Sequence, residues 1–157
     1  PSFAHHAGAS LPSFAEAGVR GQLIAGAAFG LEGAARTFSP LFYLHVQLDA
    51  GARFSLPDSY TERAAYVADG EVDVAGVRHH SGRMLVFAAG QDATLRAVTP
   101  ARLMLLGGEP VGERFIDWNF VSSSRQRIEQ AKADWRAGRM KLPDLDQDEF
   151  IPLPEAP

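Results

Sequence analysis

Hydrophobic and polar residues alternate most regularly in LFYLHVQL, residues 41–48. The even-numbered positions from Phe42 to Leu48 are all apolar, whereas Tyr43, His45 and Gln47 fall between them. Successive side chains of a strand point to opposite faces of its sheet, so a period of two predicts a half-buried β-strand. We therefore expect one face of this strand to lie in a core and the other to be more exposed.

Further short strands are predicted on both sides of this segment. The stretch AAYVADGEVDVAG favours a hairpin around Asp69-Gly70, since Asp-Gly is a strong turn dipeptide. RMLVFA, TLRAV and RLMLLGG follow, each bounded by Gly or Pro. Short strands at this spacing are typical of an antiparallel sandwich or barrel, which we expect over residues 23–121.

The pattern changes to a helical period in SSSRQRIEQAKADWRAG, residues 122–138. Ser123 and Gln126 have the spacing of an N-terminal capping box. Ile128, Ala131 and Trp135 then recur along one stripe of a helix. Gly138 stands where a left-handed residue would end it. We expect one amphipathic helix that packs against the outside of the barrel.

Both ends of the chain lack a regular period. Residues 1–22 are rich in Ala, Gly, Ser and Pro and predict an irregular N-terminal arm. Residues 139–157 are acidic and proline-rich and predict an extended tail, which Phe150, Ile151 and Leu153 could pin to a surface. With 157 residues, the chain is expected to form a single domain, residues 1–157.

Composition narrows the function classes. The net charge of −4 argues against a nucleic-acid surface, which needs clustered basic charge. The chain has no cysteine, which excludes disulfides and thiolate metal sites and fits a cytoplasmic location. We also expect neither a membrane span nor a signal peptide. Because the first residue is Pro1, the chain is expected to be an expression product, a fragment or a processed form.

The stretch GARFSLPDSYTERAAYVADG, from Gly51 to Gly70, has the glycine-bounded frame of a metal-binding motif but contains no histidine. The frame resembles the first motif of the cupin superfamily, G-x5-H-x-H-x3-E-x6-G, whose three ligand positions fall on Pro57, Ser59 and Arg63. A glycine matching that of the second cupin motif is Gly82, which places the fourth ligand position on Leu85.

A more specific resemblance, to the C-terminal half of pirin-like proteins, covers nearly the whole chain. It rests on LIAGAAFG, RTFSPLFYLHVQL, YVADGEVDVAG, GERFIDWNFVSSSRQRIEQAKADWRAGRM and DEFIPLPE. The resemblance implies a mainly β fold, a cupin barrel (a double-stranded β-helix or jelly roll) with one C-terminal helix and an extended tail.

Pirins are typically two cupin domains in tandem, and some are described as quercetin 2,3-dioxygenases. The resemblance implies an iron site in the N-terminal domain and a metal-free C-terminal domain. It therefore implies that this chain holds no cofactor and is not catalytic alone, with iron only in an N-terminal half. The implied partner is that N-terminal cupin domain or a second copy of this chain, and neither a nucleic acid nor a membrane.

Donor chemistry supports the absence of metal. A metal ion needs lone pairs converging on it, and proline and leucine side chains supply none. Arg63 would repel a cation, and Ser59 alone is a poor ligand. Glu62 is one residue out of register, which in a strand points it to the opposite face. We expect Glu62 to be a surface carboxylate.

The remaining candidates have simpler interpretations. His79 and His80 are adjacent and are expected in a turn, where they cannot chelate one ion together. His5-His6 and His45 are weak candidates, although distant histidines could still assemble a site. Ser122–Ser124 fit helix capping better than a catalytic serine. Trp118 and Phe120 fit packing, with a domain or subunit interface as the alternative.

The barrel interior is expected to be lined by Tyr66, Leu85 and Phe87 and closed by Arg63. Such a space is either filled core or a small apolar pocket. Three functions stay open: a supporting half of a two-domain pirin-like protein, a stand-alone ligand- or protein-binding module, and an independent metal-dependent enzyme with a non-standard site.

Overall fold

The computed structural model describes residues 4–142 and 150–154, and its contacts divide the chain into two compact units. We call Ala4–Pro110 the barrel unit and Val111–Pro157 the helical unit, and each is described by itself. The barrel unit holds a short 3-10 helix, η1 (Gly8–Ser10), and the strands β1 (Ser13–Glu16), β2 (Val19–Ala28), β3 (Leu31–Glu32), β4 (Leu41–Leu48), β5 (Arg53–Ser55), β6 (Glu62–Asp69), β7 (Glu71–Val74), β8 (Val77–His80), β9 (Arg83–Phe87), β10 (Thr94–Ala97) and β11 (Ala101–Gly108).

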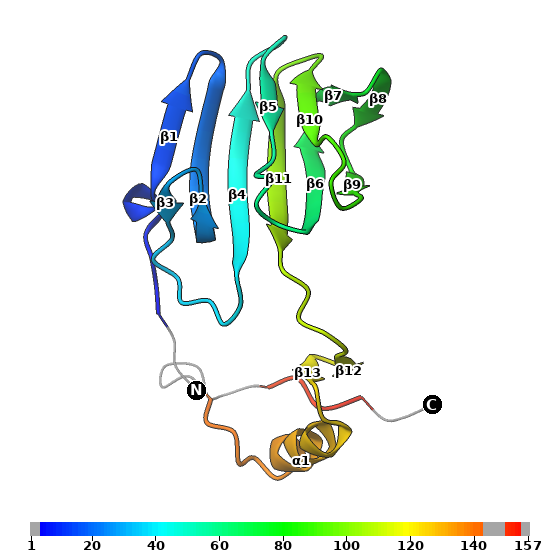
Figure 1. Ribbon diagram of the computed structural model, residues 1–157. Coiled ribbons are helices and arrows are strands. Elements are labelled where there is room, and N and C mark those ends of the chain that lie inside the picture. The colour runs from blue at the N-terminus through cyan, green and yellow to red at the C-terminus, as the bar shows by residue number, and fades with distance from the viewer. Residues whose placement is uncertain (1–3, 143–149, 155–157) are drawn as a thin grey trace. The chain divides into compact units, whose positions relative to one another are not determined.

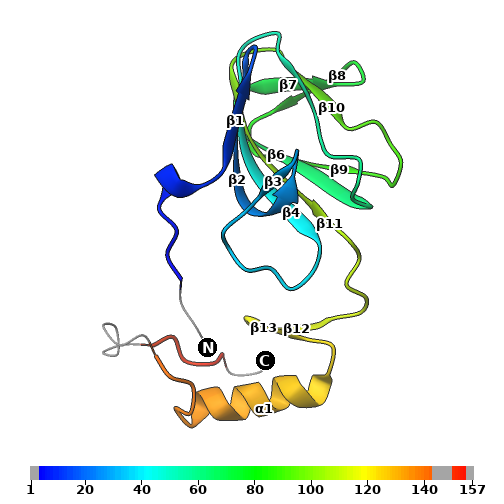
Figure 2. The same ribbon diagram turned by 60° about the vertical axis from the view of Figure 1, so that its left-hand side comes forward.

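Two antiparallel sheets form the barrel unit, so the mainly β prediction is confirmed. The larger has the strand order β1-β2-β4-β11-β6-β9, with β3 paired to β2, and the smaller has the order β5-β10-β7-β8. Figures 1 and 2 show the long strands of the first sheet side by side and the shorter strands across from them. Strands distant in sequence therefore become neighbours, as β4 and β11 do.

The core lies between the sheets and follows the alternation read from the sequence. Phe42, Leu44, Val46 and Leu48 are each at most 2% exposed on β4. On the next strand, Leu103 and Leu105 are fully buried beside Val46 and Leu44. Burying such a side chain contributes about 1.5–3 kcal/mol, so this shared apolar face holds the two sheets together.

The expected hairpin around Asp69-Gly70 is wrong. β6 pairs with β11 and β9 in the large sheet, whereas β7 pairs with β10 and β8 in the small one. Gly70 is instead the corner at which the chain leaves one sheet for the other. It has φ +80°, and a Cβ there would collide with the carbonyl of Pro100. A turn dipeptide thus predicts that the chain changes direction, but it does not predict which strand the next segment pairs with.

Two expected boundaries also differ in the structure. Residues 1–22 are not an irregular arm throughout, because β1 and the start of β2 lie within them. Gly21 of β2 favours the pairing with β1. Its lack of a side chain leaves room for the ring of Phe14, with which a Cβ at this position would collide. The barrel strands end at Gly108 and not at residue 121, just before Pro110, which has no N–H to extend a ladder.

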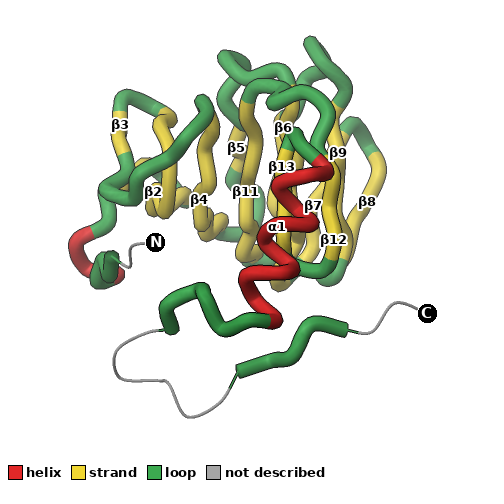
Figure 3. Tube along the Cα trace, turned by 90° about the horizontal axis from the view of Figure 1, so that it is seen from below, coloured by secondary structure: helices red, strands yellow, loops and turns green. Residues whose placement is uncertain are grey.

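The helical unit contains β12 (Phe115–Asp117), β13 (Phe120–Ser122) and α1 (Arg125–Arg136), and Figure 3 shows α1 as a long helix. The expected helix is confirmed with a shifted start. The capping residue is Ser124 and not Ser123: its hydroxyl accepts from the N–H of Arg127 over 3.4 Å. Composition alone could not choose among three consecutive serines.

The end of α1 lies where the sequence places it. Gly138 has φ +65°, its N–H donates to the carbonyl of Trp135, and the N–H of Arg139 donates to that of Asp134. These two bonds form a Schellman motif, which satisfies the last helix carbonyls.

Aromatic rings pack the helical unit. Trp118 lies 5.5 Å from both Phe120 and Trp135, and Trp135 lies 5.9 Å from Phe150. The packing interpretation of Trp118 and Phe120 is therefore confirmed. The indole N–H of Trp135 also donates to the carbonyl of Ile151, so the tail contacts α1 where the sequence suggested it could. The rest of the tail expected at 139–157 lies partly outside the described residues.

Candidate functional site

The four positions that match cupin ligands come from three parts of the barrel unit. Pro57 and Ser59 lie in the loop between β5 and β6, where Pro57 is buried and Ser59 is exposed. Arg63 lies on β6 and Leu85 on β9. The two strands pair so that Arg63 is opposite Phe87 and Ala65 is opposite Leu85. Arg63 and Leu85 therefore lie diagonally on the same inner face.

These residues do not fit a metal ion. Neither Pro57 nor Leu85 has a side-chain atom with a lone pair for a cation, and Arg63 places a permanent positive charge on the inner face. Within the described residues, no three His, Cys, Asp or Glu side chains come close enough to hold a metal ion. That the chain binds no metal in solution stays a prediction.

Arg63 is buried, with a relative exposure of 6%. Its Nη2 donates to the carbonyl oxygen of Gln91 over 2.6 Å, and its Nε is buried without a hydrogen-bond partner among the described residues. Burying an arginine is costly unless its donors and charge are compensated. The guanidinium is therefore the most unusual group of this inner face.

Arg63 belongs to a row that crosses four strands at one end of the large sheet. The strand registers place Phe42 opposite Gly107, Gly107 opposite Arg63, and Arg63 opposite Phe87. Phe42 is 1% and Phe87 is 5% exposed, so this row lies on the buried, inner face of the sheet. The sequence suggested Arg63 and Phe87 but missed Gly107, whose signal was the Gly-Gly pair that ends RLMLLGG.

A pocket of about 740 Å³ lies at this end of the sheet. All four residues of the row line it, as do residues of the next row and of the strand ends: Leu41, Tyr43, Thr61, Glu62, Ala64, Val86, Ala89, Leu106 and Gly108. The side chains of Tyr43, Ala64, Val86 and Leu106 lie on the outer face of the sheet, one residue out of phase with Arg63 and Phe87, so this pocket is not the space expected in the barrel interior. Leu85 is half-buried and packs against the core instead.

The expectation for Tyr66 is wrong. Tyr66 is 37% exposed, while its neighbours Ala65 and Val67 are fully buried. It lies three residues after Arg63, and an odd separation in a strand puts the two side chains on opposite faces. Tyr66 therefore lies on the outer face of the sheet, between Met104 and Met84.

A second hollow of about 420 Å³ lies beside the turn that joins β2 and β3. Tyr60 lies at its wall, and its hydroxyl donates to the carbonyls of Ala27 over 2.6 Å and Leu41 over 3.3 Å. These bonds account for the polar group of Tyr60. The Tyr60 hydroxyl is therefore not an unpaired group that would indicate a ligand.

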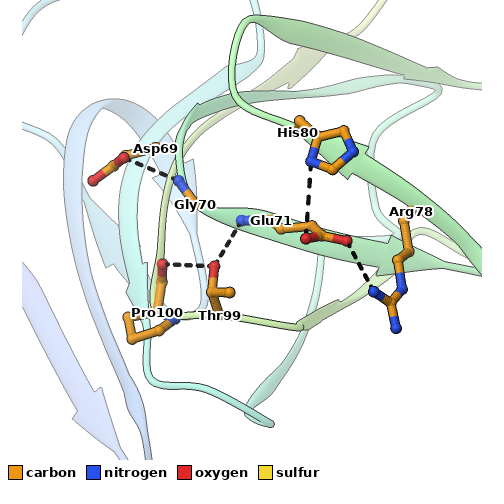
Figure 4. Close-up of polar contacts among 7 residues, drawn as sticks. All are labelled: Asp69, Gly70, Glu71, Arg78, His80, Thr99 and Pro100. Carbon is orange, nitrogen blue, oxygen red and sulfur yellow. Dashed lines mark hydrogen bonds and ion pairs between the residues drawn. The ribbon is translucent and has the colours of Figure 1, made fainter.

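The histidine pair is in a strand and not in a turn, which corrects the sequence-based expectation. His79 and His80 end β8 and lie opposite Val72 and Glu71 of β7. Figure 4 shows the Glu71 carboxylate between His80 and Arg78, at 3.8 Å and 3.5 Å. The N–H of Glu71 donates to the Thr99 hydroxyl over 3.0 Å. These contacts join β7 to β8 and to Thr99, which is a structural role that needs no ligand.

His45 lies on the outer face of β4, opposite Gln22 of β2 and Met104 of β11. Partial burial and the nearby Arg102 guanidinium lower the pKa of His45 below its ordinary value. A neutral imidazole can bind a metal. Neither Gln22 nor Met104 brings a second nitrogen or carboxylate to it, however, so the arrangement does not form a metal site.

Comparison with known proteins gives a consistent family. Residues 43–141 match the family described as the Pirin C-terminal cupin domain. A protein of Caulobacter vibrioides named "Pirin-like protein" is 57% identical over 99% of this chain and 54% of its own length. "Pirin-1" of Arabidopsis thaliana is 28% identical over 87% of this chain and 50% of its own length. The chain thus spans about half the length of the curated relatives it matches.

Solved structures agree on the fold. A crystal structure of quercetin 2,3-dioxygenase from Acinetobacter baumannii matches with a TM-score of 0.71 and 26% identity, over 82% of this chain and 47% of that one. A second structure with the same name and source gives a TM-score of 0.77 over 94% of this chain. No helix within the described residues is both long and apolar enough to cross a membrane. The matches in sequence and in fold show that this chain belongs to the pirin family and carries its C-terminal cupin domain.

Proposed function

We propose that this chain is the metal-free C-terminal half of a pirin-like protein, and that it packs against and supports an iron-binding N-terminal cupin half. In this proposal, the reaction of the whole protein, a quercetin 2,3-dioxygenase-like oxidation, takes place in the other half. The observation that carries the proposal is that residues unsuited to bind a metal occupy all four cupin ligand positions, above all the buried Arg63.

The length of the relatives supports a second half. This chain covers 54% of the Caulobacter protein and 47% of the A. baumannii dioxygenase in the first comparison. The uncovered part of each is therefore about as long as this chain. A domain of that size is large enough to carry its own core and site.

The outer face of the large sheet supports an interface. Met84 is 52% and Val86 is 77% exposed on β9, and Tyr43 and Tyr66 are each 37% exposed on β4 and β6. Contiguous exposed apolar side chains often mark protein interaction sites. We assign this face to the N-terminal half, because a second cupin domain would present a sheet that can bury it.

A stand-alone ligand-binding module is the second candidate. The observation that favours it is the pocket of about 740 Å³ on the outer face of the large sheet, whose lining residues all lie within the barrel unit. Such a pocket could bind a small molecule without any second domain. Tyr43 and Val86 line this pocket and also belong to the face assigned to the N-terminal half, so the two functions compete for the same surface.

Metal content and quercetin turnover, measured for this chain and for the full-length gene product, test the proposal. We expect stoichiometric iron and turnover only in the full-length protein. Stoichiometric iron, nickel or zinc in this chain, or quercetin turnover by it, would instead support an independent metal-dependent enzyme. If the full-length protein also lacks a second cupin domain, the stand-alone module becomes the better description.

A further inference from the structure

The helical unit has very little core of its own. It spans Val111–Pro157, and among its described residues Ile128 is the only buried side chain, with an exposure of 4%. Domains of about 60 residues are already marginally stable, because they bury too little of the surface that the unfolded chain exposes. A unit of about 50 residues with one buried side chain therefore needs a further surface to pack against.

One face of the hairpin formed by β12 and β13 is covered by α1, which runs alongside it in Figure 2. The guanidinium of Arg125 lies over the Phe115 ring, 4.0 Å from its centre. The ammonium of Lys132 lies 2.7 Å from a carboxylate oxygen of Asp117. Phe115 and Asp117 are two residues apart on β12, so both side chains point toward the helix.

The other face of the hairpin carries two exposed apolar side chains. Ile116 lies between Phe115 and Asp117, so its side chain points away from α1, and it pairs directly with Val121 of β13. Ile116 is 72% and Val121 is 60% exposed, so the rest of the described chain leaves them uncovered. Side chains directly opposite each other across two strands form one contiguous surface. We call Ile116 and Val121 the hairpin ridge.

The tip of the hairpin holds the ridge in one orientation. Trp118 begins the two-residue turn between Asp117 and Phe120 and has φ +54°, a left-handed conformation that bulky residues rarely adopt. Its ring lies 5.5 Å from those of Phe120 and Trp135, measured between ring centres. Backbone strain of this kind persists where the surrounding packing imposes it, and it is frequent at functional sites.

We propose that the hairpin ridge docks against an apolar surface of the N-terminal cupin half. This inference rests on the proposed function and adds a contact separate from the face of the large sheet. The relatives indicate the occupant, since the part of the Caulobacter protein outside the matched region is about as long as this chain. A domain in the same polypeptide acts at an effective concentration of about millimolar, so it meets the ridge before a second copy of the chain does.

Hydrogen exchange of residues 115–122, measured by mass spectrometry in the full-length gene product and in this chain, tests the proposal. We expect exchange in this segment to be about tenfold slower or more in the full-length protein, because docking stabilises the hairpin against local opening. The turn between β7 and β8, at Ala75 and Gly76, is the reference segment and should exchange equally in both. Equal exchange of residues 115–122 in the two proteins would overturn the proposal.

Serine substitutions in the full-length protein test the ridge itself. Ile116→Ser and Val121→Ser should each speed exchange of residues 115–122 toward the rate in this chain. Val77→Ser is the matched control, because Val77 is 56% exposed but lies on β8 of the small sheet, and it should leave this exchange unchanged. Unchanged exchange in a folded protein that carries both ridge substitutions would refute the ridge as the contact.

Tryptophan fluorescence separates loss of docking from loss of folding. The two tryptophans of this chain, Trp118 and Trp135, both lie in the helical unit and contact each other. In this chain alone, the ridge variants should keep the wild-type emission spectrum, because Ile116 and Val121 lie on the face away from α1. A changed spectrum would mean that these residues maintain the fold of the hairpin, and it would overturn the proposal.

A second copy of this chain is the competing occupant of the ridge. If the ridge joined two copies, exchange of residues 115–122 in this chain would slow as its concentration rises, and that result would also overturn the proposal. The outcome is separable from that of the proposed function. Iron in this chain, together with slower hairpin exchange in the full-length protein, would refute the metal-free role and keep the docking contact. Iron in the full-length protein alone, with equal hairpin exchange in both, would do the reverse.

Discussion

The guanidinium of Arg63 donates to the carbonyl oxygen of Gln91 over 2.6 Å, and this bond ties β6 to the loop that follows β9. The same loop is closed by Gln91 itself, whose N–H donates to the carbonyl of Ala88 and whose side-chain oxygen accepts from the Ala88 N–H. Arg63 thus fixes the loop at the end of the sheet where the pocket lies.

Replacing Arg63 by methionine tests how much the burial of this arginine lowers the free energy of unfolding. The variant loses a charge-assisted hydrogen bond, which contributes about 1.5–3 kcal/mol, but it also removes an unpaired buried charge. We therefore expect the free energy of unfolding, measured by urea denaturation without added anions, to change by less than about 1 kcal/mol.

Arg63→Ala is the matched comparison, because it removes the aliphatic stem as well. We expect a loss of about 2–3 kcal/mol for Arg63→Ala, since removing the buried stem leaves a cavity on the inner face of the sheet. If methionine proved as destabilising as alanine, the charge of Arg63 would already be well compensated within the chain.

The turn between β7 and β8 carries local strain at Ala75. Ala75 has φ +50° and Gly76 φ +84°, a pair of left-handed residues in a two-residue turn. Asparagine tolerates this conformation better than alanine, so Ala75→Asn should stabilise the chain by about 0.5–1 kcal/mol. Thermal unfolding would show this as a higher Tm. Ala75→Val, which is β-branched, should lower the Tm, and a gain with valine would contradict the assignment of strain.

The three consecutive serines before α1 should respond differently to alanine. Ser124→Ala removes the hydroxyl that accepts from the Arg127 N–H and should destabilise the helix by about 1 kcal/mol. Ser123 accepts no such bond, so Ser123→Ala should have little effect. Hydrogen exchange of the Arg127 amide gives a local readout. Faster exchange in both variants alike would mean that the cap is shared between the two serines.

The pH dependence of stability should contain a contribution from His45. Partial burial, and to a lesser extent the Arg102 charge, lowers the pKa of His45 in the folded state below 6.5. As the pH falls through 6.5, the unfolded chain takes up this proton before the folded chain does. Stability should therefore decrease with falling pH in the window just below 6.5 and stop decreasing on this account below the folded pKa.

Urea unfolding at a series of pH values measures this effect. His45→Gln should flatten the curve in that window, because glutamine does not titrate. Arg102→Gln should raise the pKa of His45 toward its ordinary value, which an NMR titration of the imidazole would show. A pKa at or above 6.5 in the wild-type chain would contradict the expected direction.

The pirin C-terminal cupin fold was largely predictable because its signals are local. Alternation in residues 41–48 gave β4 and its buried face, and the period of α1 gave Ile128 as its buried residue. Gly138 marked the helix end since few other residues adopt its backbone conformation. The glycines at 51 and 70 likewise gave the frame of the cupin motif, and the absence of donors at Pro57 and Leu85 could be read without a structure.

Strand partners and pocket walls were decided by tertiary structure. Asp69-Gly70 looked like a hairpin turn, but β6 and β7 join different sheets because Gly70 turns the chain at a corner against Pro100. Tyr66 was expected to face inward and faces outward, since its odd separation from Arg63 reverses its direction. The row of Phe42, Gly107, Arg63 and Phe87 spans four strands that are distant in sequence. Periodicity fixes which residues share a face of one strand, but only the register between strands decides which of them meet. The sequence therefore determined that Arg63 stands at the position of a metal ligand, and the tertiary structure decided that its side chain is buried on the inner face, in one row with Phe42 and Phe87.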